Sequence, residues 1–129
     1  MNKTEITEQR LIDFAVRILR LTTALPNNFA GDHFRKQLLR SGSSPALNYG
    51  EARSAESDRD FRHKCSIVLK ELRETHINLR IINQAGLYSA HTLADLIDEN
   101  NQLISIFVAT IRTVDRRLVN ADKNARRAK

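Results

Sequence analysis

Aromatic residues, glycine, proline and cysteine are all scarce in this chain, and tryptophan is absent. Aromatic residues make up 5% of the 129 positions, so the hydrophobic core must be mainly aliphatic. Four glycines and two prolines leave few tight turns, which favours long helices joined by short connections over a sheet of many strands. The length predicts a single domain that removes about two-thirds of its unfolded surface from water.

The single cysteine, Cys65, cannot form a disulfide within the chain, which indicates a reducing, cytoplasmic setting. The segment from Met1 to Arg10 is polar and lacks the apolar stretch of a signal peptide, so we expect none. No run approaches 18 apolar residues, and we therefore expect a soluble protein without a membrane-spanning helix.

Positive charge is concentrated at the C-terminal end. Of the net charge of +6, the segment 112–129 carries +5, because seven basic residues there face only Asp115 and Asp122. A basic end is typical of proteins that bind an acidic partner such as nucleic acid, although a solvated tail that aids solubility has the same composition. We assign residues 1–120 to the folded domain and expect residues 121–129 to form a disordered basic tail.

The hydrophobic spacing predicts a first helix that starts near Thr4 or Thr7 and runs to about Leu25. Its apolar residues follow a helical period, and Pro26 ends it. The core stripe contains Leu11, Phe14, Ala15, Ile18 and Thr22, and it is widened by Ile12, Val16 and Leu19.

The second segment starts near Asn28 or Gly31 and is ambiguous. Phe34, Leu38, Ser41, Pro45, Asn48 and Ala52 share one helical face, but the residues from Arg40 to Pro45 are mostly small and polar. By propensity this stretch is a loop. Alternatively, the helix continues past a kink at Pro45, and the small side chains allow a neighbouring helix to approach closely.

Two further helices are predicted. The third begins with Ser57 as N-cap and ends at Gly86, and its core stripe contains Phe61, Cys65, Val68, Leu72, Thr75, Leu79 and Ile82. The fourth opens at Ser89 or His91 and spans about 28 residues with the stripe Leu93, Ile97, Asn100, Ile104, Phe107, Ile111, Val114 and Leu118. Four helices with short connections predict an all-α, antiparallel up-down-up-down four-helix bundle.

Few residues have the spacing that catalysis or metal binding requires. Asp60 and His63 have the spacing found in di-iron bundles, but the chain lacks the second copy and the further glutamates that such sites need. Cys65 lies on the apolar stripe, where a thiol is normally inert, and His76 lies at its edge. We therefore expect no enzymatic activity, no metal and no cofactor.

Asn100 is a polar residue in the otherwise apolar stripe of the fourth helix. Such a residue commonly fixes the register or the oligomeric state of a bundle, with its amide bonded to another side chain. We predict that Asn100→Leu raises thermal stability and makes the oligomeric state less uniform.

The stretch from Arg40 to Leu79 resembles the bacterial four helix bundle protein family. The resemblance rests on Arg40-Ser41-Gly42-Ser43-Ser44, Asn48-Tyr49-Gly50-Glu51-Ala52, Ala55-Glu56-Ser57, Asp60-Phe61, Lys64, Lys70-Glu71 and Glu74-Thr75. The family includes proteins encoded in intervening sequences of 23S ribosomal RNA genes, and it is related to the accessory protein of diversity-generating retroelements. The chain departs from the family pattern at Pro45-Ala46, and at Ile77-Asn78 where relatives commonly carry Tyr-Trp.

The resemblance implies that residues 40–52 are helical and that the chain forms a ring-shaped homo-oligomer, a pentamer. It also implies RNA and a reverse transcriptase as partners, and it implies no enzymatic activity. The motif residues are expected to serve the structure: Ser44, Asn48, Glu51, Ser57, Asp60, Phe61, Lys64, Lys70 and Glu71.

The same motif residues suggest particular contacts by their spacing. Asp60 with Lys64, and Lys70 with Glu74, are four residues apart and predict ion pairs within the helix. We expect Glu51 to pair with an arginine across the bundle or across subunits, and Asn48 to bond to the backbone of a neighbouring helix.

Composition and resemblance together favour an oligomeric nucleic-acid-binding adaptor that recognises charge or shape, since few exposed aromatics are available for base stacking. A protein–protein scaffold is the alternative, and a metal- or thiol-dependent enzyme is a third hypothesis. The candidate contacts to RNA or DNA are Arg35, Lys36, Arg40, Arg53, Arg59, Arg62, Arg116, Arg117, Lys123, Arg126 and Arg127.

Overall fold

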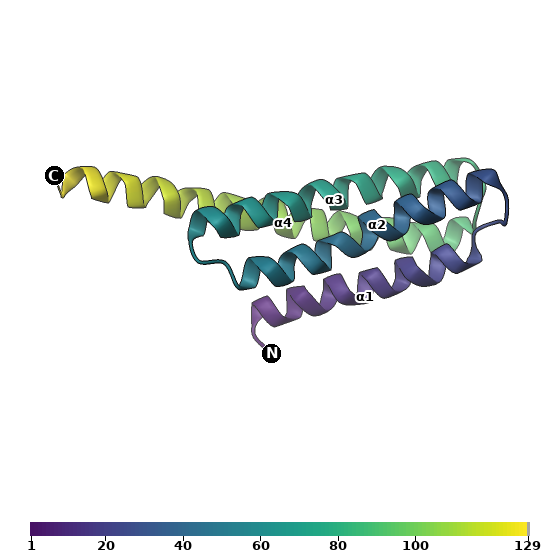
Figure 1. The fold of residues 1–129 in the computed structure, drawn as a ribbon, viewed down its shortest axis with the longest axis horizontal. Helices are drawn as coiled ribbons and strands as arrows, with labels where there is room; N and C mark the ends of the chain where they lie inside the picture. The colour runs from purple at the N-terminus through teal and green to yellow at the C-terminus, as the bar shows by residue number, and fades with distance from the viewer. Residues whose placement is uncertain (129) are drawn as a thin grey trace.

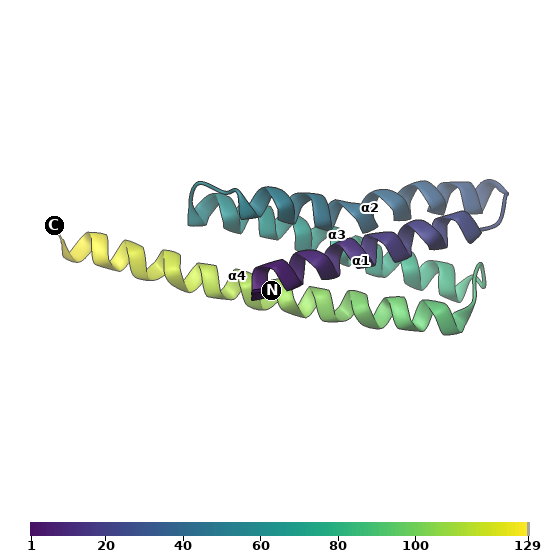
Figure 2. The same ribbon diagram turned by 90° about the horizontal axis from the view of Figure 1, so that it is seen from below.

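A computed structural model describes residues 1–128 as four antiparallel α-helices, which confirms the predicted all-α bundle. The helices are α1 (Lys3–Ala24), α2 (Phe29–Arg53), α3 (Asp58–Gln84) and α4 (Ala90–Arg127). Figures 1 and 2 show α1, α2 and α3 side by side with the first part of α4, while the end of α4 extends beyond the bundle. Consecutive helices pack closely, and α1 makes much less contact with α4 than with α2. In the described part of the chain, no helix is long and apolar enough to cross a membrane.

Local sequence explains where the first three helices begin. Asn2 caps α1 in a capping box with Glu5, whose backbone N–H lies 2.9 Å from the Asn2 side-chain oxygen. Asn28 caps α2 by accepting from Gly31, and Ser57 caps α3 by accepting from Asp60 at 3.1 Å. The N-cap predicted at Ser57 is therefore confirmed.

The connection after α3 needs a residue in the left-handed conformation. Gly86 has φ 69°, the only positive φ among the described residues, and the Leu87 N–H donates to the carbonyl of Ile82 at 3.1 Å. This arrangement satisfies carbonyls that a helix end otherwise leaves unpaired. It confirms the helix end predicted at Gly86.

Helix α2 is continuous through the serine-rich stretch, so the loop interpretation was wrong and the helical one is confirmed. Pro45 lies inside the helix and its side chain is buried. A Cβ added at Gly42 would lie 2.7 Å from Cγ2 of Ile18, which shows how closely α1 approaches here. Ser43 donates its hydroxyl to the carbonyl of Leu39 at 2.7 Å. The small residues are thus required by helix packing, which local propensity does not register.

The predicted core is largely confirmed and has a few corrections. In α4, Leu96 and Leu103 are buried in place of the predicted Ile97 and Ile104, which are only partly buried. The widened stripe of α1 was wrong: Ile12, Val16 and Leu19 are 41%, 39% and 48% exposed. In α2, Tyr49 is buried and Asn48 only half-buried; the Tyr49 ring meets that of Phe107 edge to face at 5.3 Å. The predicted stripe of α3 is buried from Cys65 to Ile82, with Phe61 at its half-buried end.

Buried polar side chains form a small group near the middle of the bundle. Asn78 donates to the hydroxyl of Ser41 at 3.3 Å, and the Thr75 hydroxyl donates to the carbonyl of Glu71 at 2.8 Å. Asn100 is completely buried, and neither atom of its amide has a hydrogen-bond partner among the described residues. The expectation that another side chain forms hydrogen bonds with the Asn100 amide was therefore wrong for the side chains of this single chain.

Helix α4 is longer than predicted. Its 38 residues extend about 57 Å at 1.5 Å per residue, and helical structure continues through residues 121–127. A disordered tail was expected for residues 121–129, of which Lys129 lies outside the described residues. Ala121 and Ala125 favour the helix, and Arg126 and Arg127 in its last turn interact favourably with the negative end of the helix dipole. We call residues 115–127 the arm.

Candidate nucleic-acid interface

Six of the predicted nucleic-acid contacts are ion-paired within the chain. The pairs are Arg35 with Asp32, Arg40 with Glu71 and Glu74, Arg53 with Glu8, Arg59 with Asp122, Arg62 with Asp115, and Arg117 with Asp58. Most of these partners lie on other helices, so the sequence spacing could not reveal them. A phosphate would have to compete with a carboxylate for each of these six guanidinium groups.

Arg35 serves the structure in addition to its ion pair. Its Nε donates to the Thr22 carbonyl at 3.1 Å, and its Nη2 donates to the Leu25 carbonyl at 2.9 Å. Both carbonyls lie at the C-terminal end of α1, where helices leave carbonyls without their regular partners; that of Thr22 also accepts from the Leu25 N–H at 3.4 Å. Arg35 thereby caps α1 and ties α2 to it, so we remove it from the candidate interface.

Arg40 links α2 to α3 through two carboxylates. It donates to Glu71 at 3.0 Å and also to Glu74, while the Glu71 side chain is largely buried. The bond to Glu74 raises the pKa of the Arg40 guanidinium, and the same bond lowers the pKa of the Glu74 carboxyl. Glu74 was expected to pair with Lys70, which was wrong, because Arg40 reaches it from the facing helix.

The other motif residues also contact different partners from those predicted. Lys64 donates to Glu51 at 2.7 Å across the α2–α3 pair, and not to Asp60 on its own helix. Glu51 therefore pairs with a lysine instead of an arginine. Asn48 donates to the carbonyl and hydroxyl of Ser44 at 3.0 and 2.8 Å within α2, not to a neighbouring helix.

Five predicted contacts have no ion-pair partner among residues 1–128: Lys36, Arg116, Lys123, Arg126 and Arg127. Four of them belong to the arm. Arg112, one turn before Arg116, is also exposed and outside every ion pair of these residues.

The unpaired cations of the arm lie on one side of α4 together with Arg112. With 100° per residue, Arg112, Arg116, Lys123, Arg126 and Arg127 fall within an arc of about 100°. They span about 23 Å along the helix axis at 1.5 Å per residue. All five are exposed. We call this set the basic stripe. Figure 2 shows the segment that carries most of it projecting beyond the other helices.

Carboxylates of the arm are bonded away from the basic stripe. Asp115 accepts from Arg62 at 2.9 Å, and Asp122 lies 3.6 Å from Arg59. Both arginines belong to α3. The two arginines thereby partly neutralise the negative charge of these carboxylates. The stripe itself keeps only cations, with Val119 between them as an exposed apolar residue.

A second group of unpaired cations lies on α3 and was missed as an interface. Lys70, Arg73 and Arg80 are exposed, and none is ion-paired within residues 1–128. Lys70 was assigned a structural role only. Arg73 and Arg80 are seven residues apart, and this spacing places them on the same side of a helix, which is the feature of the sequence that could have indicated the group.

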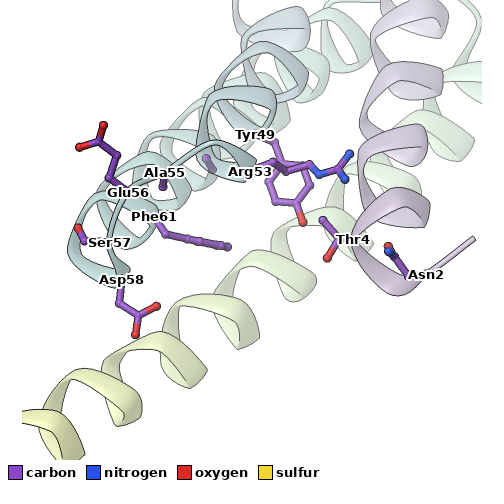
Figure 3. A pocket seen from close by; sticks show the side chains of 10 residues that line it. Asn2, Thr4, Tyr49, Arg53, Ala55, Glu56, Ser57, Asp58 and Phe61 are labelled. Atoms are coloured by element: carbon purple, nitrogen blue, oxygen red, sulfur yellow. The ribbon is translucent and has the colours of Figure 1, made fainter.

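A cleft of about 660 Å³ lies at the end of the bundle where α1 begins. Figure 3 shows Tyr49 extending from α2 towards Thr4, with Phe61 and Asp58 on the opposite wall. Two of its charged groups are engaged, because Arg53 pairs with Glu8 and Asp58 with Arg117, both at 3.1 Å, whereas Glu56 has no ion pair among the described residues. Burial raises the pKa of the Tyr49 hydroxyl above its ordinary value.

Burial favours the neutral forms of two further ionisable side chains, Cys65 and His76. Cys65 is fully buried, and desolvation raises the pKa of its thiol to about 12. Desolvation also lowers the pKa of His76, with a further contribution from Arg80. Within residues 1–128 there is no group of three or more His, Cys, Asp and Glu residues placed to bind a metal ion.

Comparisons with known proteins agree with the fold and with the sequence resemblance. The family model of the 23S rRNA-intervening sequence proteins matches residues 4–109. A crystal structure from Bacteroides thetaiotaomicron, described as a protein of unknown function from the S23 ribosomal protein family, superposes with a TM-score of 0.78. The two chains are 29% identical, over 86% of this chain and 99% of the other. A comparison with curated proteins gives no match.

Proposed function

We propose that this chain, which belongs to the family of 23S rRNA-intervening sequence proteins, acts as an oligomeric adaptor that binds nucleic acid through its arm. The observation that carries the proposal is the basic stripe, because its five cations are exposed and none forms an ion pair within residues 1–128. The matched region ends at residue 109, so the stripe lies beyond the part that the family model describes.

Electrostatics favour the arm over the rest of the surface. A cation that meets a phosphate releases a condensed counterion, and this gain drives most non-specific binding. An arginine already bonded to a carboxylate gains less, because the carboxylate must be left behind. Most of the paired arginines therefore contribute to stability, while the stripe and the cations of α3 remain available for phosphates.

The proposed role is binding without catalysis. It is supported by the protonated state of the two side chains that could otherwise act as nucleophiles, the Cys65 thiol and the Tyr49 hydroxyl. Measured turnover of RNA, DNA or nucleotides by the purified protein would contradict this part of the proposal.

Charge reversal at matched positions tests the nucleic-acid role. The triple variant Arg116→Glu, Lys123→Glu, Arg127→Glu alters the stripe, and Lys70→Glu, Arg73→Glu, Arg80→Glu changes the net charge equally on α3. We expect the first variant to lose at least tenfold more affinity for labelled nucleic acid at about 50 mM salt. Absence of binding by the unmodified protein at that salt concentration would refute the proposed function.

A second candidate function, a protein–protein scaffold, is favoured by an apolar surface between α1 and α2. Ile12 and Leu19 lie on the same side of α1 as Glu8, whose carboxylate pairs with Arg53 of α2. Val16 lies beside them, and Leu39 lies next to Arg35 on the α1-facing side of α2. The four apolar residues are 38–48% exposed, and exposed apolar groups that adjoin one another commonly mark contacts with proteins.

The self-association that the resemblance implies is assigned to this same surface. We expect Val16→Glu with Leu19→Glu to shift the mass measured by light scattering towards one subunit, while Ile77→Glu on α3 leaves it unchanged. A monomeric unmodified protein would remove the oligomer and the implied pentamer from the proposal. A protein partner, such as the reverse transcriptase that the resemblance implies, would be captured after nuclease treatment.

A further inference from the structure

The basic stripe differs from an ordinary basic tail because its charges are held in a fixed row. We infer that the stripe binds a double helix, through its phosphates, in preference to a single strand. This inference rests on the proposed function, since it specifies the nucleic acid that the same surface takes. Three properties of the arm support it: the line of its charges, its lack of aromatic residues and its projection from the bundle.

The row of charges suits a rigid polyanion. The five cations lie within an arc of about 100° and along about 23 Å of a single helix. A duplex presents one phosphate charge per about 1.7 Å of its axis, in a geometry that does not change on binding. A flexible single strand has to be straightened along the row, and it releases fewer counterions for each contact.

The arm lacks the groups on which single-strand binding depends. Proteins that hold single strands stack bases on aromatic side chains, but the arm contains none, and Val119 is the large apolar residue exposed among its cations. Contacts are therefore confined to phosphates and sugars, which position a duplex but do not read its sequence.

The projection of the arm gives a duplex room to approach. Figures 1 and 2 both show the end of α4 with no other helix alongside it. The last carboxylate contact with α3 is that of Asp122 with Arg59, so Lys123, Arg126 and Arg127 lie beyond it. An α-helix with its side chains is about 10–12 Å wide, which matches the major groove of duplex DNA at about 12 Å. Duplex RNA has a narrow major groove, and there the stripe would contact phosphates across the shallow minor groove.

The test compares the affinities of the protein for fluorescently labelled DNA and RNA of 24 nucleotides, each as single strand and as duplex, at about 50 to 200 mM salt. We expect at least one duplex to bind at least tenfold more tightly than its own single strand. Equal or tighter binding of both single strands would overturn the inference and leave the proposed function intact. Failure of all four probes to bind would refute the proposed function itself.

Two paired variants locate the contact. Lys123→Ala with Arg126→Ala removes two cations of the stripe, and Arg73→Ala with Arg80→Ala removes two from α3. We expect the first variant to reduce the slope of log affinity against log salt by about 1.8 on a duplex, at about 0.9 per lost phosphate contact. The α3 variant should leave the slope nearly unchanged. An equal reduction in both variants, with circular dichroism showing both folded, would overturn the assignment to the arm.

Discussion

Helix α4 is continuous, but its two parts contribute differently to the protein. From Leu93 to Val114 the helix buries one residue in every three or four against the other helices. From Asp115 onward no side chain is fully buried, and three ion pairs connect the helix to α3. The first part derives its stability from burial of apolar area, whereas the arm exposes its charges. The comparison shows that helical structure and contribution to folding can be separated within a single element.

The most disruptive way to probe this comparison is to remove apolar volume from each part. Phe107 is completely buried and packs against Tyr49, so Phe107→Ala should cost about 3–5 kcal/mol of unfolding free energy. Val119 in the arm is 51% exposed, and Val119→Ala should change stability by no more than about 0.5 kcal/mol. Urea denaturation followed by circular dichroism measures both. Equal effects would show that the arm packs on something besides the described chain.

The next largest effect concerns the close approach of α1 and α2. A methyl group at position 42 would meet Ile18 at 2.7 Å, so Gly42→Ala should destabilise the bundle by about 1–3 kcal/mol. Gly50 in the same helix has open space at its Cβ position, and Gly50→Ala should stabilise by about 0.5–1 kcal/mol. Thermal denaturation of the two variants gives shifts of opposite sign. Stabilisation by both would mean that α1 moves away from α2 without cost.

A comparable effect, of opposite direction, is expected within the core part of α4. Asn100→Leu removes two buried polar atoms without partners and should raise stability by about 1–3 kcal/mol. Asn78→Leu is the control, because Asn78 is bonded to Ser41 and its loss should destabilise. Thermal melting gives the stability, and light scattering tests whether Asn100→Leu makes the oligomeric state less uniform. A destabilised Asn100→Leu variant would show that the amide is hydrogen-bonded in solution.

The smallest effect is expected from removing the end of the arm. A chain that stops at Asn120 loses Lys123, Arg126 and Arg127 together with the exposed pair of Asp122 and Arg59. Such a pair contributes about 0–1 kcal/mol, so the unfolding free energy should fall by less than about 1 kcal/mol. Nucleic-acid affinity should fall much more than stability does. A much larger fall in the unfolding free energy would show that residues 121–127 belong to the cooperatively folded domain.

Sequence reasoning was most accurate where the cause of a structural feature is local. The cap at Ser57, the end of α3 at Gly86 and the stripe from Cys65 to Ile82 all depend on residues within a few positions of one another. It was least accurate for the partners of charged residues. Arg40 and Lys64 bond to carboxylates on facing helices, because the antiparallel register brings those groups closer than any group on the same helix.

The candidate interface was predictable only in part for the same reason. The concentration of charge after residue 111 is visible in the sequence, and so is the spacing that places five cations on one side of a helix. The loss of Arg35, Arg53 and Arg62 to ion pairs, and the exposure of Arg73 and Arg80, depend on how the helices rotate against one another. Rotation is decided by packing over the whole bundle.

By itself the sequence determined four helices, the cap at Ser57, the end of the third helix at Gly86, an aliphatic core and a cationic end, because each follows from spacing and local chemistry. Only the tertiary structure decided that the helix continues through residues 41–45, since the reason is the contact of Gly42 with Ile18 on another helix. It also decided which arginines are neutralised, which apolar residues stay exposed between α1 and α2, and that the Asn100 amide has no hydrogen-bond partner within residues 1–128. These features depend on distances between helices, and a one-dimensional pattern contains no such distances.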